Sequence, residues 1–246
     1  LAGTEITNVP APAGTSTGSS AILHAESARG TEIASSLGYS YTYSTLDKGL
    51  NPDAGFLFRW SQDFAGVAGD VSYANSTVLA LAERKVLNDE VTVRAIFEGG
   101  AHVSFGNDVS RITDRFTLNQ KLRGFDQFSV GPRDTSVTNN DALGGNYFAV
   151  AKFEAEFPLG LPEEYGVHGG VFLDVGSVWG LDNTAGGPLG GPVSQVDDGF
   201  KLRSAVGVSL FWDTPIGPLR FNFSRTLKKE SFDLERDFDL TISTRF

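Results

Sequence analysis

The chain has 246 residues, a formal net charge of −10, and neither Cys nor Met. The acidic balance argues against a nucleic-acid partner, because phosphate binding needs clustered Lys and Arg. The lack of Cys excludes a disulfide framework and a thiolate metal site. No apolar run approaches the roughly 18 residues of a transmembrane helix, which leaves open a membrane barrel whose strands alternate over about 10 residues each.

The first residues lack a basic region followed by an apolar stretch, so we expect no signal peptide here. With no initial Met, the chain is interpreted as a processed product or a fragment of a longer protein. Residues 1–34 are rich in Gly, Ser, Thr, Ala and Pro. They are predicted to form the end of a strand and then an extracellular loop, with a short helix near residues 20–28.

Apolar and polar residues alternate strictly from Ser35 onward. A period of two with aromatic residues on one side is typical of a strand with one solvated face. The pattern predicts about nine strands of about 9–13 residues, the length that crosses a bilayer at the tilt of a barrel. They lie near residues 35–44, 56–64, 71–85, 91–103, 146–157, 167–179, 201–213, 219–224 and 238–246.

The distribution of side chains and loops favours a transmembrane antiparallel β-barrel over a soluble β-sandwich, which is the alternative. Apolar faces carry bulky aromatic residues near strand ends, namely Trp60, Trp179, Trp212 and Phe246. Connections alternate in length, as in outer-membrane barrels. The long ones are 104–145, 180–199 and 228–237, and the short ones are 47–54, 86–90, 158–166 and 214–218.

An odd number of strands does not close an ordinary bacterial barrel. An open sheet in lipid would expose unpaired backbone groups, each of which costs several kcal/mol. We therefore expect residues 35–246 to be the C-terminal part of a barrel, with the missing strands supplied by upstream sequence or by partner chains.

The stretch from Lys121 to Asn146 is long, rich in Gly, Asn, Asp and Thr, and has no steady period. A loop of this length is usually functional or disordered. It contains Arg123, whose guanidinium can bind a carboxylate through two parallel hydrogen bonds. Glu154 and Asp174 face the lumen by strand parity on neighbouring strands. We predict that loop 104–145 folds into the lumen and that Arg123 meets these acids; a solvated loop arginine is the alternative.

Four motifs occur in the order and spacing of a known family over about 125 residues. They are Leu122-Arg123-Gly124-Phe125, which matches a (V/I/L)RGF loop motif; Gly144-Gly145-Asn146, which opens a strand; Phe172-Leu173-Asp174-Val175-Gly176 followed by Trp179; and Ser204-Ala205-Val206-Gly207 with Pro215-Ile216-Gly217-Pro218-Leu219 and a terminal Phe246. Residues 35–120 fit only through their strand pattern. The chain resembles the Omp85 superfamily of outer-membrane barrels, in particular its assembly factors.

The resemblance implies a barrel of about 16 strands preceded by soluble POTRA repeats. This chain would supply the end of strand 7 and strands 8 to 16, and would lack the POTRA repeats and the first strands. The family also implies the pairing of the loop arginine with both acids. Gly124 would allow a tight turn, and Phe125 would pack among lumen side chains.

The last strand carries an outward apolar stripe, Phe238, Leu240, Ile242 and Phe246. It resembles the signal that barrel proteins present to the assembly machinery. It would also be the movable side of a lateral seam between first and last strands, because an edge strand can template an incoming strand. An ordinary lipid-facing strand remains the alternative.

We therefore expect a non-enzymatic factor of the bacterial outer membrane that folds and inserts β-barrel proteins, without a cofactor or a bound metal. The expected partners are nascent outer-membrane proteins, accessory outer-membrane lipoproteins, and lipid or lipopolysaccharide. His24, His102 and His168 are the only histidines, and a structural role is expected because no Ser, His and acid set forms a catalytic motif. The alternatives are a two-partner secretion or translocation relative, and a passive porin.

Overall fold

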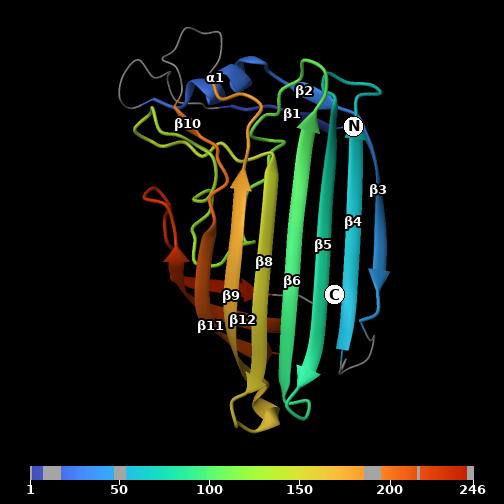
Figure 1. Cartoon of the computed structure of the whole chain (residues 1–246), viewed down its shortest axis with the longest axis vertical. Helices are drawn as coiled ribbons and strands as arrows, with labels where there is room; N and C mark the ends of the chain where they lie inside the picture. The colour runs from blue at the N-terminus through green and yellow to red at the C-terminus, as the bar shows by residue number, and fades with distance from the viewer. Residues whose placement is uncertain (1, 8–17, 47–53, 186–194, 215–216, 243–246) are drawn as a thin grey trace.

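The computed structural model describes residues 2–7, 18–46, 54–185, 195–214 and 217–242 (Figure 1). Its main element is a nine-stranded sheet in the order β13-β12-β11-β9-β8-β6-β5-β4-β3. The nine predicted strands are confirmed, with small shifts at their ends. They are β3 (Ser36–Ser44), β4 (Ala54–Ala65), β5 (Tyr73–Val86), β6 (Val91–Ser104), β8 (Tyr147–Pro158), β9 (Val167–Trp179), β11 (Arg203–Thr214), β12 (Gly217–Lys228) and β13 (Phe238–Ile242).

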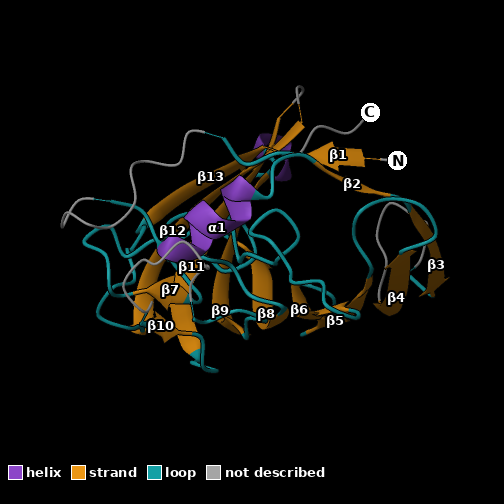
Figure 2. Ribbon diagram, turned by 90° about the horizontal axis from the view of Figure 1, so that it is seen from above, coloured by secondary structure: helices purple, strands orange, loops and turns teal. Residues whose placement is uncertain are grey.

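Each of these strands pairs antiparallel with the next one along the chain. The sheet curves into an arc in the view from above (Figure 2), and loops fill its concave side. It begins at β3 and ends at β13, and these two edges are not paired with each other in the described residues. The chain thus forms a partial barrel, as the odd strand count predicted.

The long connections gather at one end of the sheet together with the short β4–β5 connection, residues 66–72, and the other short turns lie at the opposite end (Figure 1). The long-loop end also carries two small paired strands, β7 (Arg133–Asp134) and β10 (Val196–Asp197). A 3₁₀ turn, η1 (Glu163–Tyr165), lies in one of the short connections. None of the helical segments in the described part of the chain has the length and hydropathy that a membrane-spanning helix needs.

The N-terminal segment lies over the long-loop end. Its first strand, β1 (Ala2–Thr4), pairs with β2 (Glu32–Ala34) and not with the main sheet. Between them lies the predicted helix, α1 (Ala21–Ala28). The Ser20 hydroxyl accepts a hydrogen bond from the Ile22 backbone N–H at 3.2 Å, which satisfies one of the free donors at the helix N-terminus.

Strand parity separates an exposed convex face from a covered concave face. Phe153 of β8 lies on the convex face and is 51% exposed. Phe172 and Asp174 of β9 lie on the concave face and are 3% and 0% exposed. The sequence predicted a polar lumen face, but near the long loops this face is apolar. Phe148, Val150, Val178 and Ala205 form a buried cluster there with loop side chains, because the loop excludes water from the wall.

Candidate functional site

The connection between β6 and β8, residues 105–146, is called the lumen loop because it packs against the concave face of the sheet. Four of its buried apolar side chains, Leu118, Leu122, Phe125 and Val130, contact the cluster on β8, β9 and β11. Burial of apolar area stabilises the folded protein by about 25 cal/mol per Å². The loop is therefore part of the core of this half-barrel.

Arg123 belongs to this loop and contacts both predicted acids, Asp174 and Glu154. Its Nε and Nη2 donate to the two carboxylate oxygens of Asp174 at 2.7 and 2.5 Å, and its backbone N–H donates to Oδ2 at 3.1 Å. Its Nη1 lies 2.7 Å from Oε1 of Glu154. The guanidinium also stacks on the Phe172 ring, 3.7 Å from its centroid. A planar fork with several fixed donors is the feature that distinguishes Arg from Lys at such a site.

Glu154 is shared between two arginines. Its Oε1 also lies 2.7 Å from Nη2 of Arg220 on β12. The two guanidinium groups and the two carboxylates cancel in charge, which lowers the cost of holding them out of water. The side chains of Arg123, Glu154 and Asp174 are only 9%, 7% and 0% exposed. Arg220 was not predicted from the sequence as part of this site.

Gly124 turns the loop where it touches the wall. Its φ is +87°, in the left-handed region that favours glycine. A Cβ at this position would lie 2.7 Å from Cβ of Ala205 on β11, closer than two carbons normally approach. The glycine thus permits the close contact with Ala205 that brings the neighbouring Arg123 against the wall.

The segment Gly144-Gly145-Asn146 ends the lumen loop where β8 begins. Gly145 exchanges two backbone hydrogen bonds with Phe116, at 2.8 and 3.0 Å, and a Cβ on it would lie 2.8 Å from backbone atoms of Trp179. Gly144 has φ +67°. Asn146 is buried, and its side chain binds Ser110 and Asp182. The motif therefore closes the base of the loop.

Gly176 lies on β9, in the part of the concave face that the lumen loop covers. A Cβ there would lie 3.0 Å from Cγ2 of Val150 and 3.5 Å from Cδ1 of Leu122. The absence of a side chain therefore leaves room for Val150, which belongs to the same buried cluster as Leu122. Phe172 lies four residues earlier on the same face of β9 and supplies the ring on which Arg123 stacks.

The lumen loop is also hydrogen-bonded to the segment that leads into β13. Phe125 forms an antiparallel bridge with Glu235, flanked by hydrogen bonds from Asp126 N–H to Leu234 O at 2.9 Å and from Arg236 N–H to Gly124 O at 3.1 Å. Beside them, the Ser129 hydroxyl donates to Leu234 O at 3.0 Å and accepts from Leu234 N–H at 2.6 Å. The loop thus pairs with the chain just before the last strand through an isolated antiparallel bridge.

A buried ion pair supports this second contact. Arg203, at the start of β11, donates through Nε to Asp233 at 3.0 Å, and both side chains are at most 1% exposed. The sequence offered no signal for this pair, because Asp233 stands in a charged loop without periodicity.

The last strand pairs with β12 alone, from Phe223↔Phe238 to Leu219↔Ile242. Phe238 and Leu240 are 46% and 44% exposed. The side chain of Ile242 and all of Phe246 lie outside the described residues. Because the far edge of β13 has no neighbour among the strands that the structure describes, its backbone groups are available to another strand.

Comparison with known proteins identifies the family. Residues 5–246 match the model of the Omp85 superfamily domain. The chain belongs to the Omp85 superfamily. Membership places this Omp85 chain in the bacterial outer membrane.

This Omp85 chain is similar to three known proteins. It is 34% identical to the outer membrane protein assembly factor BamA of Neorickettsia risticii, over 82% of this chain and 26% of that protein. It is 29% identical to the human sorting and assembly machinery component 50 homolog, over 62% of this chain and 33% of that protein. Its fold resembles the crystal structure of BamA from Haemophilus ducreyi lacking POTRA domains 1–3, with a TM-score of 0.71 and 22% identity over 87% of this chain and 43% of that one.

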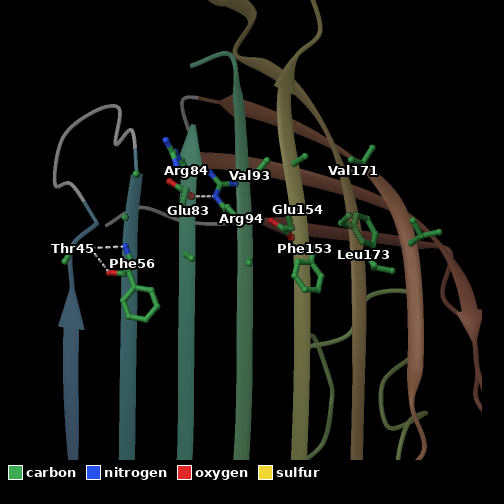
Figure 3. Close-up of a pocket in the computed structure, with 17 residues that line it drawn as sticks. Thr45, Phe56, Glu83, Arg84, Val93, Arg94, Phe153, Glu154, Val171 and Leu173 are labelled. Carbon is green, nitrogen blue, oxygen red and sulfur yellow. Dashed lines mark hydrogen bonds and ion pairs between the residues drawn. The ribbon is translucent and has the colours of Figure 1, made fainter. Parts of the chain in front are cut away.

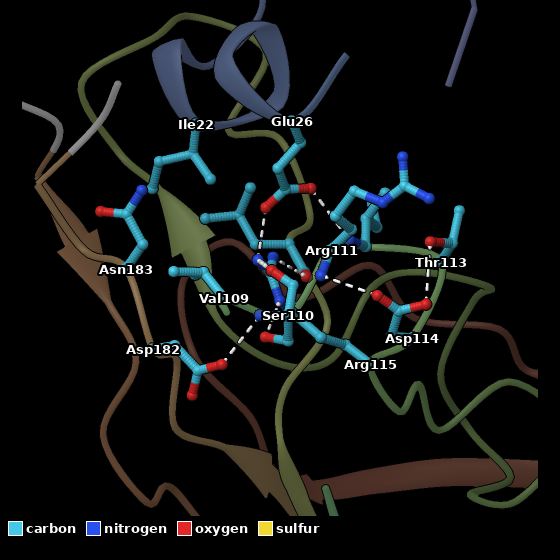
Figure 4. A network of polar contacts seen from close by, with 12 residues as sticks. Ile22, Glu26, Val109, Ser110, Arg111, Thr113, Asp114, Arg115, Asp182 and Asn183 are labelled. Atoms are coloured by element: carbon cyan, nitrogen blue, oxygen red, sulfur yellow. Dashed lines mark hydrogen bonds and ion pairs between the residues drawn. The ribbon is translucent and has the colours of Figure 1, made fainter. Parts of the chain in front are cut away.

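A second polar network, missed from the sequence, holds the N-terminal segment of the Omp85 chain on the lumen loop (Figure 4). Arg115 of the loop pairs with Glu26 of α1, and their side chains are 0% and 5% exposed. Glu26 also accepts from Ile112 N–H at 2.9 Å, and Arg111 lies 2.9 Å from Glu32. Burial raises the pKa of the Glu26 carboxyl, and the Arg115 guanidinium opposes that rise.

Glu26→Ala is expected to detach α1 from the lumen loop, because it leaves the Arg115 guanidinium buried without its carboxylate; such a loss costs about 3–5 kcal/mol. Glu26→Gln should cost less, since its one amide oxygen can still accept from either the Ile112 N–H or the Arg115 guanidinium, which bind different oxygens of the carboxylate. Hydrogen exchange over residues 21–28 would measure the effect. Equal protection in wild type and Glu26→Ala would contradict this role for the pair.

The three histidines lie away from the Arg123 site. His102 is 2% exposed, and its ring lies against Tyr73 with centroids 4.8 Å apart. His168 lies 3.3 Å from Glu156 near the short turns. In the described ranges no three His, Cys, Asp or Glu side chains are grouped so as to hold a metal ion.

Proposed function

We propose that this chain is the C-terminal part of a non-enzymatic factor that folds and inserts β-barrel proteins into the bacterial outer membrane. The observation that carries the proposal is the double attachment of the lumen loop. Arg123 binds the wall at Asp174 and Glu154, and the adjoining residues pair with the segment that enters the last strand. The relatives named as assembly factors support it.

The proposed mechanism uses the free edge of β13. The seam between the first strand, upstream of this chain, and β13 opens. The exposed N–H and C=O groups of β13 then pair with a strand of the incoming protein. The lumen loop holds the start of β13 in position for this exchange, because backbone hydrogen bonds join residues 124–126 to residues 234–236.

The partners that follow from this function are nascent outer-membrane barrel proteins, accessory outer-membrane lipoproteins, and the surrounding lipid and lipopolysaccharide. Strand pairing and lateral release need no bond chemistry, so the proposal includes no cofactor and no catalytic residue.

Reconstitution of the full-length protein tests this function. Vesicles that contain it should accelerate the folding of a urea-unfolded outer-membrane barrel protein, measured as protease-resistant, heat-modifiable product, relative to empty vesicles. No acceleration, together with a large steady conductance in planar bilayers, would show a passive pore instead. Passage of an unfolded chain into the vesicle lumen without its insertion would indicate a secretion protein.

Strand pairing at β13 can be tested by cross-linking, because the chain contains no Cys. Thr241→Cys on β13 should form disulfides with a cysteine in a terminal strand of a stalled substrate. Ser76→Cys is the matched control, since β5 is paired on both sides by β4 and β6. Cross-linking at Ser76→Cys that equals that at Thr241→Cys would argue against insertion at this edge.

A further inference from the structure

The convex face of the sheet carries a hollow of about 930 Å³ close to the short-turn end (Figure 3). Two small residues, Ala82 on β5 and Ala95 on β6, stand directly opposite each other in its floor. The same row of the sheet continues to Phe56 on β4 and to Phe153 on β8. We call these four residues the alanine trough.

The depth of the trough follows from side-chain size. Methyl groups on the two central strands leave the backbone uncovered, whereas Phe56 and Phe153 are 40% and 51% exposed and form its sides. Phe rings bury about 150–250 Å² when they are covered, so a chain that lies between them gains contact on both flanks. Since this face is the lipid-facing one of an outer-membrane barrel, the material that fills the trough is hydrocarbon.

A cation stands at the short-turn end of the trough. Arg84 lines the hollow and is directly opposite Ala54 and Val93, in the next outward-facing row. It is two residues from the end of β5 at Val86, which is about 7 Å along a strand. This depth corresponds to the headgroup region and not to the hydrocarbon centre.

Arg84 differs from the charged residues beside it. Glu83 and Arg94 point to the concave side and pair with each other there. Arg84 has no ion pair or hydrogen-bond acceptor among the described side chains. A guanidinium at a membrane boundary interacts favourably with an anionic headgroup, since Arg binds phosphate through two parallel donors.

We propose that the alanine trough and Arg84 bind one anionic phospholipid from the leaflet nearest the short turns. One acyl chain lies on Ala82 and Ala95 between the two Phe rings, and the phosphate accepts hydrogen bonds from Arg84. The site depends on the chain being embedded in a membrane and is independent of the insertase activity. It would hold lipid on the strands β4 to β8, far in the sheet from the β13 edge.

Native mass spectrometry of the full-length protein, released from vesicles of phosphatidylglycerol and phosphatidylethanolamine, tests the proposal. The wild type should retain phosphatidylglycerol in preference to phosphatidylethanolamine. Arg84→Gln should lower that retention about fivefold, the effect expected for one basic side chain at an anionic surface. Arg84→Lys should keep most of it, because the charge remains.

Two further variants separate the trough from its cation. Ala95→Phe fills the floor and should reduce the retention of phosphatidylglycerol even though Arg84 is intact. Lys85→Gln removes a neighbouring charge that faces the concave side by parity, and it should retain lipid as the wild type does. Unchanged retention in both Arg84→Gln and Ala95→Phe would overturn the proposal, as would equal loss in Lys85→Gln.

Discussion

Arg123→Ala should release the lumen loop and lower the amount of outer-membrane protein assembled in cells. The substitution leaves Asp174, which is 0% exposed, without the guanidinium that binds both its oxygens. Removal of one partner of a buried pair costs about 3–5 kcal/mol, and less to the extent that water enters. Arg123→Lys should restore little, because an ammonium cannot supply the two parallel hydrogen bonds.

The shared carboxylate predicts an order among the variants. Asp174→Ala should impair assembly too, although Arg123 then keeps Glu154. Glu154→Ala should be milder than Arg123→Ala, because Arg123 keeps Asp174 and the freed Arg220 is 24% exposed. Increased protease cleavage within residues 121–145, measured on the purified full-length protein, reports the release of the loop directly.

A matched control is Lys229→Ala. It removes an ion pair with Glu235 whose side chains are 46% and 35% exposed, and exposed pairs contribute only about 0–1 kcal/mol. Its protease pattern should match the wild type. Normal outer-membrane protein levels in both Arg123→Ala and Asp174→Ala would remove the functional role that we assign to the lumen loop.

Gly124→Ala should displace the same loop by a steric route that leaves every charge in place. A non-glycine residue at positive φ costs about 1–3 kcal/mol, and an added methyl in a packed core costs about 1–3 kcal/mol more. The new Cβ would meet Cβ of Ala205 at 2.7 Å. We expect cleavage within residues 121–145 and a loss of assembly close to that of Arg123→Ala.

The clash provides its own control. Ala205→Gly removes the obstructing methyl, so the double variant Gly124→Ala with Ala205→Gly should recover part of the loop protection. The backbone strain at residue 124 remains, so recovery should be incomplete. If the double variant is no better protected than Gly124→Ala alone, contact with β11 is not what makes glycine necessary here.

The coupling of the loop to β13 extends both predictions. Because residues 124–126 are hydrogen-bonded to residues 234–236, displacement of the loop should also loosen the start of β13. Hydrogen exchange at residues 234–242 should therefore increase in Arg123→Ala and in Gly124→Ala. An increase confined to the lumen loop would mean that the two attachments act independently.

The alternation of residue types was enough to predict the strands and their faces, and the motifs were enough to predict the family. A period of two depends only on neighbouring residues, and it therefore located nine strands and put Glu154 and Asp174 on the lumen side. The Leu122-Arg123-Gly124-Phe125 motif identified the loop cation that lies against them. The tertiary structure added contacts that no pattern predicted: Arg220 at the Arg123 site, the separate Arg115–Glu26 pair, the apolar lumen cluster and the bridge from Phe125 to Glu235. These contacts join residues far apart along the chain, most of them in loops without periodicity, so their partners are set by how the curved sheet and its loops pack, which no local pattern encodes.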